Sequence, residues 1–456
     1  YQNAVEKMAE KGIISGFPDG SFCPEQTLTR AQAAKILCVM LEGEEKANAL
    51  TQTETGFTDV LATHWAAKFI AYCADKGIVA GIGGGKFDPE GTLSSAAFAK
   101  MLLVAYGEDG AKFTGADWVT KVQTAAEPTF LPFQIKFDLT DAPVQRQEAA
   151  TLAFNAMFQA EAKADKEKGD SRTLPERLPE TVKLLVIGNS FGNDCSIAYL
   201  YRLLEKAGVK NVVVGTLYYS GCPYEKHLTF GLLDQSVYTY YKNTKNGFAS
   251  YDGFTLDRAI ANEDWNYILM LSGYTGHPKD FGPCPWQDLL LYYVRRSRPD
   301  AYYGFDMTWA FQAGSDKEAY VKYYDSNQMK MYSTILETTK QYVVPEQRFK
   351  FIAPVGTAIQ NARTSFIGDH LDRDGYHLNK GIGRYIATMT VCCTLTGCKP
   401  EQIDYLPEAI LDEMPEGLSK DTPGILEKLG EVARESVANA LARPYEVTQS
   451  KFTTAP

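Results

Sequence analysis

The sequence predicts two architectures in one chain: a bundle of repeated helical units, followed by an α/β domain with helices on both faces of a parallel sheet. Two observations lead to this prediction. The segment KGIISG at residues 11–16 recurs as KGIVAG at residues 76–81, an offset of 65. From residue 183 onward, short apolar runs that predict strands alternate with segments that predict helices. This alternation of strand and helix predicts a parallel sheet.

The repeated unit is predicted to be a helix, a glycine-rich turn and a second helix. Thr29 and Gln32 form an S/T-x-x-E/Q capping box, which predicts that a helix begins there and covers residues 30–41. A third, degraded copy occupies residues 113–157 and lacks the turn glycines. One unit cannot cover its own apolar face, so we expect the three copies to pack on one another.

The repeats resemble S-layer homology modules, the cell-wall anchoring repeats of Gram-positive and related bacteria. The second copy carries the fuller pattern, with FTDV at residues 57–60 and HWA at residues 64–66 ahead of its turn. The resemblance implies a pseudo-threefold all-α bundle over residues 1–158 whose grooves bind secondary cell-wall polysaccharide. Because the first copy lacks the FTDV-to-HWA stretch, we expect the natural protein to extend further N-terminally, through that stretch and a secretion signal.

The same resemblance assigns residues to wall binding. The arginine of the family's TRAE-like motif is matched in two of the three copies, whereas the second copy has Ser95 at that position. The predicted wall-binding residues are Arg30, Trp65 and Arg146. A helical packing module that binds no ligand is the alternative interpretation.

The rest of the chain divides into a connector, the α/β domain and a tail. Residues 159–181 are charged and contain prolines, which predicts a short charged helix and an extended connector. The α/β domain is predicted over residues 182–400, and residues 401–456 predict a helical extension with a polar end. The expected strands are 183–187, 211–217, 267–271, 302–307 and 351–354. The expected helices are 196–207, 286–296, 317–341, 380–395 and 423–442.

Three residues of the α/β domain can supply the chemistry of a serine hydrolase. Ser190 follows the first expected strand directly, and Asp374 and His377 lie three residues apart near the end of the domain. A serine hydroxyl needs a base to take its proton and a third group to orient that base. The Gly-Asn-Ser segment alone predicts only a turn with a capping serine, but its order with the acid and the histidine favours catalysis. Asp372 is the alternative orienting acid.

This arrangement resembles the SGNH or GDSL hydrolase superfamily over residues 182–397, and within it a bacterial branch with GNSF at the serine. The resemblance implies a flavodoxin-like three-layer sandwich. It also implies an oxyanion hole formed by the amide of Ser190, a glycine N–H at Gly221, and a third donor where the family has asparagine and this chain has Thr275.

Composition limits the partners. The net charge of −10 argues against a nucleic-acid-binding surface, and no apolar run approaches the roughly 20 residues that span a bilayer. The nine cysteines have no CxxC spacing, so free thiols are expected, with no metal and no cofactor. Aromatic residues near strand ends are candidates for stacking on sugars, although core packing explains each one equally well. The candidates for substrate binding are Tyr219, Tyr274 and Trp309.

The sequence therefore favours a secreted serine esterase of the bacterial cell surface that removes O-acyl groups, such as acetyl groups, from a polysaccharide or glycan. In this hypothesis Ser190 is the nucleophile, His377 the base and Asp374 the orienting acid. Two alternatives remain. The substitution at Thr275 favours an inactive SGNH-fold protein that binds glycan, and the repeats alone favour a structural protein of the surface layer.

Overall fold

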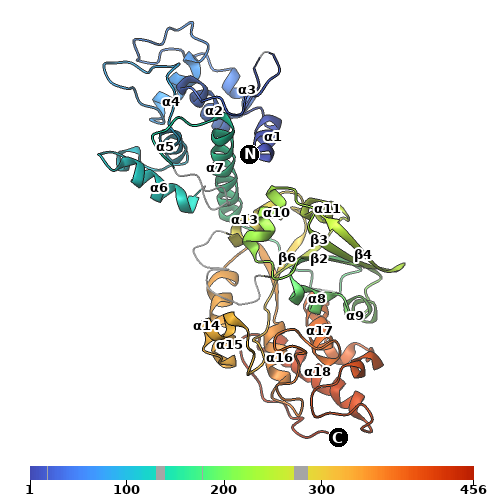
Figure 1. Ribbon diagram of the computed structural model, residues 1–456. Coiled ribbons are helices and arrows are strands. Elements are labelled where there is room, and N and C mark those ends of the chain that lie inside the picture. The colour runs from blue at the N-terminus through green and yellow to red at the C-terminus, as the bar shows by residue number, and fades with distance from the viewer. Residues whose placement is uncertain (18, 130–138, 177, 272–285) are drawn as a thin grey trace. The chain divides into compact units, whose positions relative to one another are not determined.

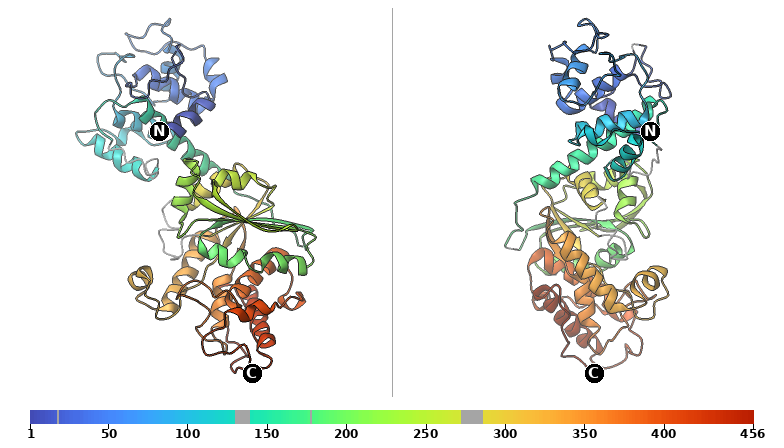
Figure 2. Two further views of the ribbon diagram at one scale, coloured as in Figure 1. Left: turned by 45° about the vertical axis from the view of Figure 1, so that its right-hand side comes forward. Right: turned by 90° about the vertical axis from the view of Figure 1, so that its left-hand side faces the viewer.

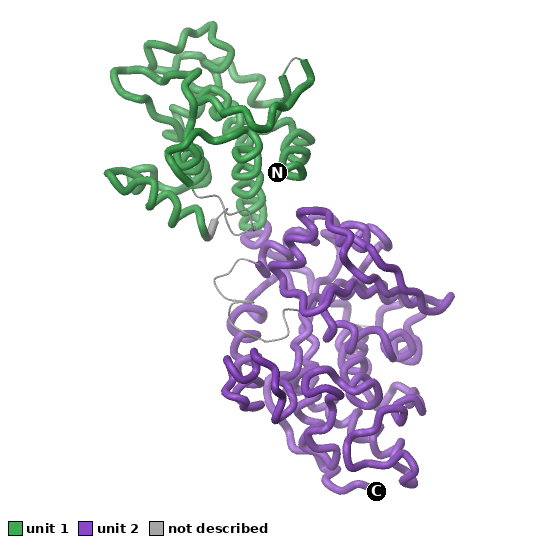
Figure 3. Tube along the Cα trace, in the orientation of Figure 1, with its two compact units in different colours: residues 1–164 green, residues 165–456 purple. Residues whose placement is uncertain are grey.

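The computed structural model describes residues 1–17, 19–129, 139–176, 178–271 and 286–456 (Figure 1). The chain forms two compact units, unit 1 over Tyr1–Ala164 and unit 2 over Asp165–Pro456 (Figure 3). Their boundary falls inside the connector that the sequence predicts at 159–181. The first part of this segment continues one long helix, α7 (Arg146–Lys168), because its alanine, lysine and glutamate residues all favour helix.

Unit 1 is built from helices and short turns. Its helices within the described residues are α1 (Gln2–Glu10), α2 (Arg30–Glu42), α3 (Glu44–Asn48), α4 (Ala67–Asp75), α5 (Ser95–Ala105), α6 (Trp118–Thr129) and α7. The predicted capping box is present at the start of α2, where the N–H of Gln32 donates to Oγ1 of Thr29 at 3.2 Å and the N–H of Thr29 donates to Oε1 of Gln32 at 3.2 Å. The helical character of the N-terminal region agrees with the predicted bundle.

A closed ring of backbone hydrogen bonds joins the three repeats. The N–H of Leu28 donates to the carbonyl of Val144 at 2.9 Å, that of Val144 to Leu93 at 2.9 Å, and that of Leu93 to Leu28 at 3.0 Å. Each of these residues lies just before the second helix of its repeat. The degraded third copy therefore takes the same structural position as the other two, although it lacks their turn glycines.

Unit 2 contains a seven-stranded sheet in the order β4-β3-β2-β1-β5-β6-β7. The strands are β1 (Thr181–Gly188), β2 (Asn211–Tyr218), β3 (Tyr238–Thr244), β4 (Gly247–Phe254), β5 (Tyr267–Met270), β6 (Tyr302–Asp306) and β7 (Phe349–Ala353). Strands β2, β1, β5, β6 and β7 are parallel, and in chain order they follow the 2-1-3-4-5 pattern of flavodoxin-like folds. The predicted parallel α/β fold is confirmed, as are its five strands, with ends shifted by at most two residues.

Helices cover both faces of the sheet (Figure 2). Those described in unit 2 are α8 (Ser190–Ser196), α9 (Leu200–Lys206), α10 (Tyr224–Leu232), α11 (Leu256–Ala261), α13 (Trp286–Arg295), α14 (Glu318–Tyr324), α15 (Gln328–Thr338), α16 (Val355–Ala362), α17 (Ile382–Thr396) and α18 (Ile425–Ala442). Helices α8, α9 and α17 lie on one face, and α10, α11 and α13 lie on the other (Figure 1). The three layers place the carboxyl ends of the parallel strands beside the start of α8.

Two predicted helices of this unit need correction, and one hairpin was missed. The single helix expected over 317–341 is two helices, because Asp325 and Ser326 adopt left-handed backbone angles (φ 52° and 55°) that end α14. The helix expected over 196–207 is likewise two helices, and the first begins already at Ser190. The antiparallel hairpin β3–β4 was not predicted, because most of its side chains are at least partly exposed and its sequence has no apolar alternation.

Candidate active site

The structure brings the three predicted catalytic residues together. Oγ of Ser190 lies 2.7 Å from Nε2 of His377, and Nδ1 of His377 lies 2.7 Å from Oδ2 of Asp374. An imidazole that carries its proton on Nδ1 donates to the carboxylate and accepts the serine hydroxyl at Nε2. The candidate nucleophile, base and orienting acid are thus connected by two hydrogen bonds.

Local sequence fixes Ser190 at the carboxyl end of β1. Asn189 has an extended backbone and caps α8, since its Oδ1 accepts the N–H of Phe191 at 3.0 Å. Gly188 permits close packing of the strand end, because a Cβ there would lie 2.2 Å from a methyl carbon of Leu271. Asn189 is fully buried. The Gly-Asn-Ser segment therefore works as a tight strand-to-helix junction that presents the serine.

A short turn positions the histidine. Oδ1 of Asp374 accepts the backbone N–H of His377 at 2.9 Å, and the N–H of Arg373 donates to the carbonyl of His377 at 2.8 Å. Gly375 has a positive φ of 83°, which a residue with a Cβ rarely adopts. Burial acts to raise the pKa of Asp374, but the hydrogen bonds from His377 outweigh it, so its pKa lies below the usual value and the carboxylate is ionised.

The alternative acid, Asp372, has a different partner. Its Oδ2 lies 2.6 Å from Nη2 of Arg363, and its side chain is fully buried. Burial raises the pKa of Asp372 to about 6, and Arg363 opposes that rise. Asp374, rather than Asp372, is the carboxylate that contacts the imidazole.

One buried carboxylate beside the catalytic residues was missed from the sequence. Asp194 lies on α8 four residues after Ser190 and its side chain has 0% exposure. It contacts the segment that follows His377, where its Oδ2 accepts the N–H of Leu378 at 3.0 Å. It also pairs with Arg384, whose Nη2 lies 2.7 Å from its Oδ1. A single acidic residue in a helix gives no sequence signal for partners so far along the chain.

The structure describes two of the three predicted oxyanion donors, Ser190 and Gly221. Tyr218, at the end of β2, pairs with Gly188 in the sheet, and the N–H of Tyr219 donates to the carbonyl of Gly188 at 3.4 Å. The loop that contains Gly221 is thereby held beside the strand that ends at the serine. Within the described ranges, the amide N–H groups of Ser190 and Gly221 donate to no protein acceptor. Thr275 and Tyr274 lie outside the described residues.

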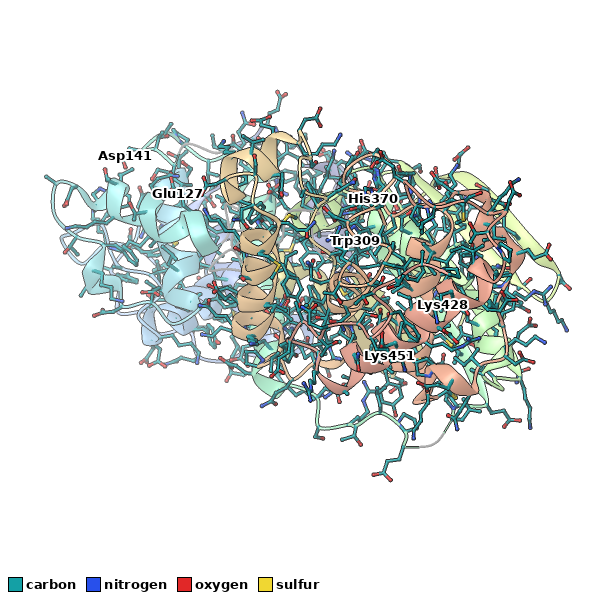
Figure 4. The ribbon with its side chains drawn as sticks, turned by 90° about the horizontal axis from the view of Figure 1, so that it is seen from below. Glu127, Asp141, Trp309, His370, Lys428 and Lys451 are labelled. Atoms are coloured by element: carbon teal, nitrogen blue, oxygen red, sulfur yellow. The ribbon has the colours of Figure 1, made fainter. Side chains whose placement is uncertain are left out.

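The aromatic candidates for substrate binding have different surroundings. Trp309 is fully buried in unit 2, where Figure 4 labels it, so the prediction that it stacks on a sugar is wrong. Its ring stacks on Phe191 at 4.4 Å between centroids, and its Nε1–H donates to the carbonyl of Tyr376 at 2.8 Å. Tyr219 is half-buried, and the ammonium of Lys226 lies 4.5 Å from its ring centroid. Trp309 thus packs against the residues next to Ser190 and His377, and Tyr219 remains a candidate for substrate binding.

In unit 1, Arg30 reaches from the start of α2 to the turn of the second repeat. Its Nε donates to the carbonyl of Phe87 at 2.7 Å, and its Nη2 donates to the carbonyl of Ala80 at 2.6 Å. The guanidinium carbon also lies 4.4 Å from the centroid of the Phe87 ring. Arg30 therefore connects two repeats.

Arg146 makes the equivalent contacts from α7 to the turn of the first repeat. Its Nε donates to Phe22 and its Nη2 to Ser15, both at 2.9 Å, and these acceptors precede those of Arg30 by the same offset of 65 residues. At the third interface Ser95 replaces arginine, and its Oγ accepts the N–H of Thr140 at 2.9 Å. The two arginines thus connect neighbouring repeats.

Unit 1 also has an exposed tryptophan and a groove that are candidates for ligand binding. Trp65 is an exposed residue, with a relative exposure of 51%. A groove of about 700 Å³ lies beside Arg30 and is lined partly by Lys100 and Trp118. Cationic and aromatic side chains of this kind suit an anionic or sugar ligand.

No group of three or more His, Cys, Asp or Glu residues is arranged to hold a metal ion in the part of the chain that the structure describes. No helix among the described residues is both long and apolar enough to span a membrane. Eight of the nine cysteines are described, and all eight are free thiols.

Comparison with known proteins gives a family for each unit. The model of the family described as "Domain of unknown function (DUF4886)" matches residues 183–416. A solved DUF4886 family protein from Bacteroides uniformis is 33% identical, and the match covers 60% of this chain and 100% of that chain with a TM-score of 0.53. The S-layer homology domain model matches residues 1–34 and 56–99.

Two curated relatives match shorter stretches. "Cell surface glycoprotein 1" of Acetivibrio thermocellus is 37% identical over 93 residues, which are 20% of this chain and 4% of that protein. "Cellulosome-anchoring protein" of the same species is 31% identical over 111 residues, which are 24% of this chain and 25% of that protein. The chain thus spans a quarter or less of the length of these relatives. The repeats and the cell-surface relative indicate a secreted protein at the cell surface.

Proposed function

The chain belongs to the DUF4886 family, a domain of unknown function, and carries S-layer homology repeats; we propose that it is a cell-surface serine esterase of SGNH type that removes O-acyl groups, such as acetyl groups, from a polysaccharide or glycan. The observation that carries this proposal is the connected chain Ser190–His377–Asp374, with 2.7 Å at both links.

The geometry supports a two-step acyl transfer. Oγ of Ser190 attacks the ester carbonyl while Nε2 of His377 takes the hydroxyl proton, and Asp374 stabilises the resulting imidazolium. The oxyanion that forms accepts hydrogen bonds from the amides of Ser190 and Gly221. Collapse of this intermediate breaks the ester C–O bond, and the imidazolium of His377 gives its proton to the departing sugar oxygen, which leaves as a hydroxyl group. Water, deprotonated by His377, then attacks the acyl-serine and releases the carboxylic acid and free Ser190.

The accessibility of the site supports a polymeric substrate. The side chain of His377 is 13% exposed and that of Asp374 is 44% exposed, so the reacting groups lie near the surface of unit 2. An acyl group on a long glycan can reach such a site without the whole sugar chain entering a cavity. The surface location of the protein also favours wall and extracellular glycans as substrates.

We assign wall attachment to unit 1, with secondary cell-wall polysaccharide as the partner. The groove beside Arg30 and the exposed Trp65 support this assignment. The name of the Cellulosome-anchoring protein describes an anchoring role for that relative, and it agrees with an anchor here. Sedimentation with purified walls tests the assignment: the full chain is expected to pellet, and a Trp65→Ala variant is expected to pellet less. Equal pelleting of both would overturn the role of Trp65.

Hydrolysis of p-nitrophenyl acetate tests the esterase proposal. We expect turnover by the full chain, loss of turnover in Ser190→Ala, and retention in the matched control Ser419→Ala, which changes an exposed serine in the C-terminal extension. A fluorophosphonate probe is expected to label Ser190, with mass spectrometry locating the adduct. Equal turnover by the wild-type protein and Ser190→Ala would refute the proposal and favour a glycan-binding role.

A further inference from the structure

We propose that Asp194 is a positioning residue for this reaction: its buried carboxylate holds the histidine loop against the helix of the nucleophile, which keeps His377 within reach of Ser190. This inference rests on the proposed esterase function and adds a fourth residue to its machinery. It assigns a role to a charged group that the Ser–His–Asp chemistry leaves unexplained.

The first tie is a direct hydrogen bond between the two catalytic segments. Asp194 lies one turn after Ser190 on α8, and its Oδ2 accepts the N–H of Leu378 at 3.0 Å. Leu378 follows His377 directly in the chain. A shift of this loop away from α8 would therefore break the bond to Asp194 and lengthen the Ser190–His377 contact together.

The second tie consists of ion pairs between Asp194 and two arginines, one before and one after His377 in the chain. Arg384, in the first turn of α17, places Nη2 at 2.7 Å and Nε at 2.8 Å from Oδ1 of Asp194. Arg373, just before the acid of the triad, places Nη1 at 3.3 Å from the same oxygen. Segments before and after His377 thus converge on one carboxylate.

Because the carboxylate of Asp194 is buried, it depends on all of these contacts. The side chain of Asp194 has 0% exposure, and those of Arg373 and Arg384 are 23% and 18% exposed. A carboxylate out of water needs its charge compensated and its oxygens bonded. Burial raises the pKa of Asp194, and the two guanidinium groups act against that rise. The N–H of Leu378 and the guanidinium of Arg373, both from the histidine loop, and the guanidinium of Arg384 from α17 meet this need. These contacts favour the position of the loop in which His377 reaches Ser190.

Asp194 also contributes to the charge around the imidazole, with which it interacts electrostatically. The Lys317 ammonium lies 4.2 Å from the centroid of the Tyr376 ring, which in turn lies 3.9 Å from that of His377. The charged side chains that face or surround His377 are Asp374, Asp194, Arg373, Arg384 and Lys317. Loss of the Asp194 charge increases the excess of cations around the imidazole and so disfavours the imidazolium.

Steady-state kinetics of the full chain on p-nitrophenyl acetate test the proposal. Asp194→Ala removes both acceptor oxygens, and we expect kcat to fall about 100-fold with KM changed less than about twofold, as for a small displacement of a catalytic group. Asp194→Asn keeps one acceptor oxygen and is expected to retain about tenfold more activity than Asp194→Ala. The acidic limb of its kcat/KM profile is expected at lower pH than in the wild-type protein.

The matched control is Asp170→Ala. Asp170 is another buried carboxylate of unit 2, 2.6 Å from Nη2 of Arg172, and it has no contact with the catalytic residues. We expect it to lower stability without lowering kcat. Equal kcat losses in Asp170→Ala and Asp194→Ala, or an unshifted acidic limb in Asp194→Asn, would overturn the positioning role.

Hydrogen exchange separates this inference from the esterase proposal. The amide of Leu378 is expected to exchange faster in Asp194→Ala than in the wild-type protein, while amides of β5 exchange at unchanged rates. If the wild-type protein turns over no ester, the esterase proposal fails, and the tie between α8 and the histidine loop is judged by this exchange alone. Unchanged protection at Leu378 would overturn it.

Discussion

Arginine side chains connect distant segments in both units, but their partners differ. In unit 1, Arg30 and Arg146 donate to backbone carbonyls and stack on phenylalanine rings. In unit 2, Arg373 and Arg384 converge on the buried carboxylate of Asp194. The acceptors of Arg146 and Arg30 lie at equivalent positions of the first and second repeats, so the carbonyl-and-ring contact recurs at two of the three interfaces. The ionic contact needs one carboxylate in one place, and it occurs where the proposed chemistry requires exact alignment of two segments.

The largest expected effect follows from breaking the hydrogen bond that orients the base. Asp374→Asn is expected to lower kcat by about 10³–10⁴-fold, because an amide cannot hold the imidazole in the required tautomer with the same charge. Steady-state kinetics on p-nitrophenyl acetate measure this, with Asp412→Asn as the matched control at an exposed position. A loss below tenfold would show that another acid, Asp372 first, takes this role.

The next largest effect is expected from a substitution that removes one partner of the ionic contact in unit 2. Arg384→Gln leaves Asp194 buried with an incomplete set of donors, and we expect the free energy of unfolding to fall by about 3 kcal/mol at pH 8. The loss is expected to become smaller as the pH falls from 8 to 5, because burial raises the pKa of Asp194 and a protonated carboxyl group does not require the guanidinium. Urea unfolding at both pH values checks this. A loss that is the same at both would argue against an ionised Asp194.

Asp306 is a buried carboxyl group with no arginine partner among the described residues, and it can be compared with the arginine-paired Asp194. Asp306, at the end of β6 beside Cys195, is fully buried, and burial raises its pKa to about 7. Because the folded-state pKa lies above the unfolded value, the group lowers stability as pH rises from about 4 to 7, and the loss stays constant above pH 7. We expect Asp306→Asn to stabilise the protein by about 2 kcal/mol at pH 8 and not at pH 4. Urea unfolding across this range measures it, and a pH-independent difference would contradict it.

The smallest effect is expected in unit 1. Arg146→Gln removes two hydrogen bonds to neutral carbonyls, and we expect unit 1 to lose about 1–2 kcal/mol of stability. Neither partner titrates between pH 5 and 8, so the loss is expected to be equal at both, unlike that of Arg384→Gln. Far-UV circular dichroism during urea unfolding tests this. A pH-dependent loss would remove the distinction between the two kinds of contact.

Sequence predicted most of the fold, because its signals are periodic or local. The offset of 65 residues identified the repeats, and the apolar runs identified the five parallel strands. Ser190, Asp374 and His377 were found from residue type and order. Residues whose role depends on distant partners were not found. Asp194 is an ordinary helical acid until the chain folds, and Trp309 has the same residue type whether buried or exposed. The exposed hairpin β3–β4 likewise has no apolar pattern.

The closed ring formed by Leu28, Leu93 and Val144 has a mechanical consequence. Each repeat is bonded to both others, so tension that enters unit 1 through α7 is shared by three interfaces instead of peeling one repeat at a time. Such sharing of load suits the wall-anchoring role proposed for unit 1. In single-molecule stretching we expect unit 1 to yield in one rupture event, and three successive ruptures would show that the ring does not distribute load.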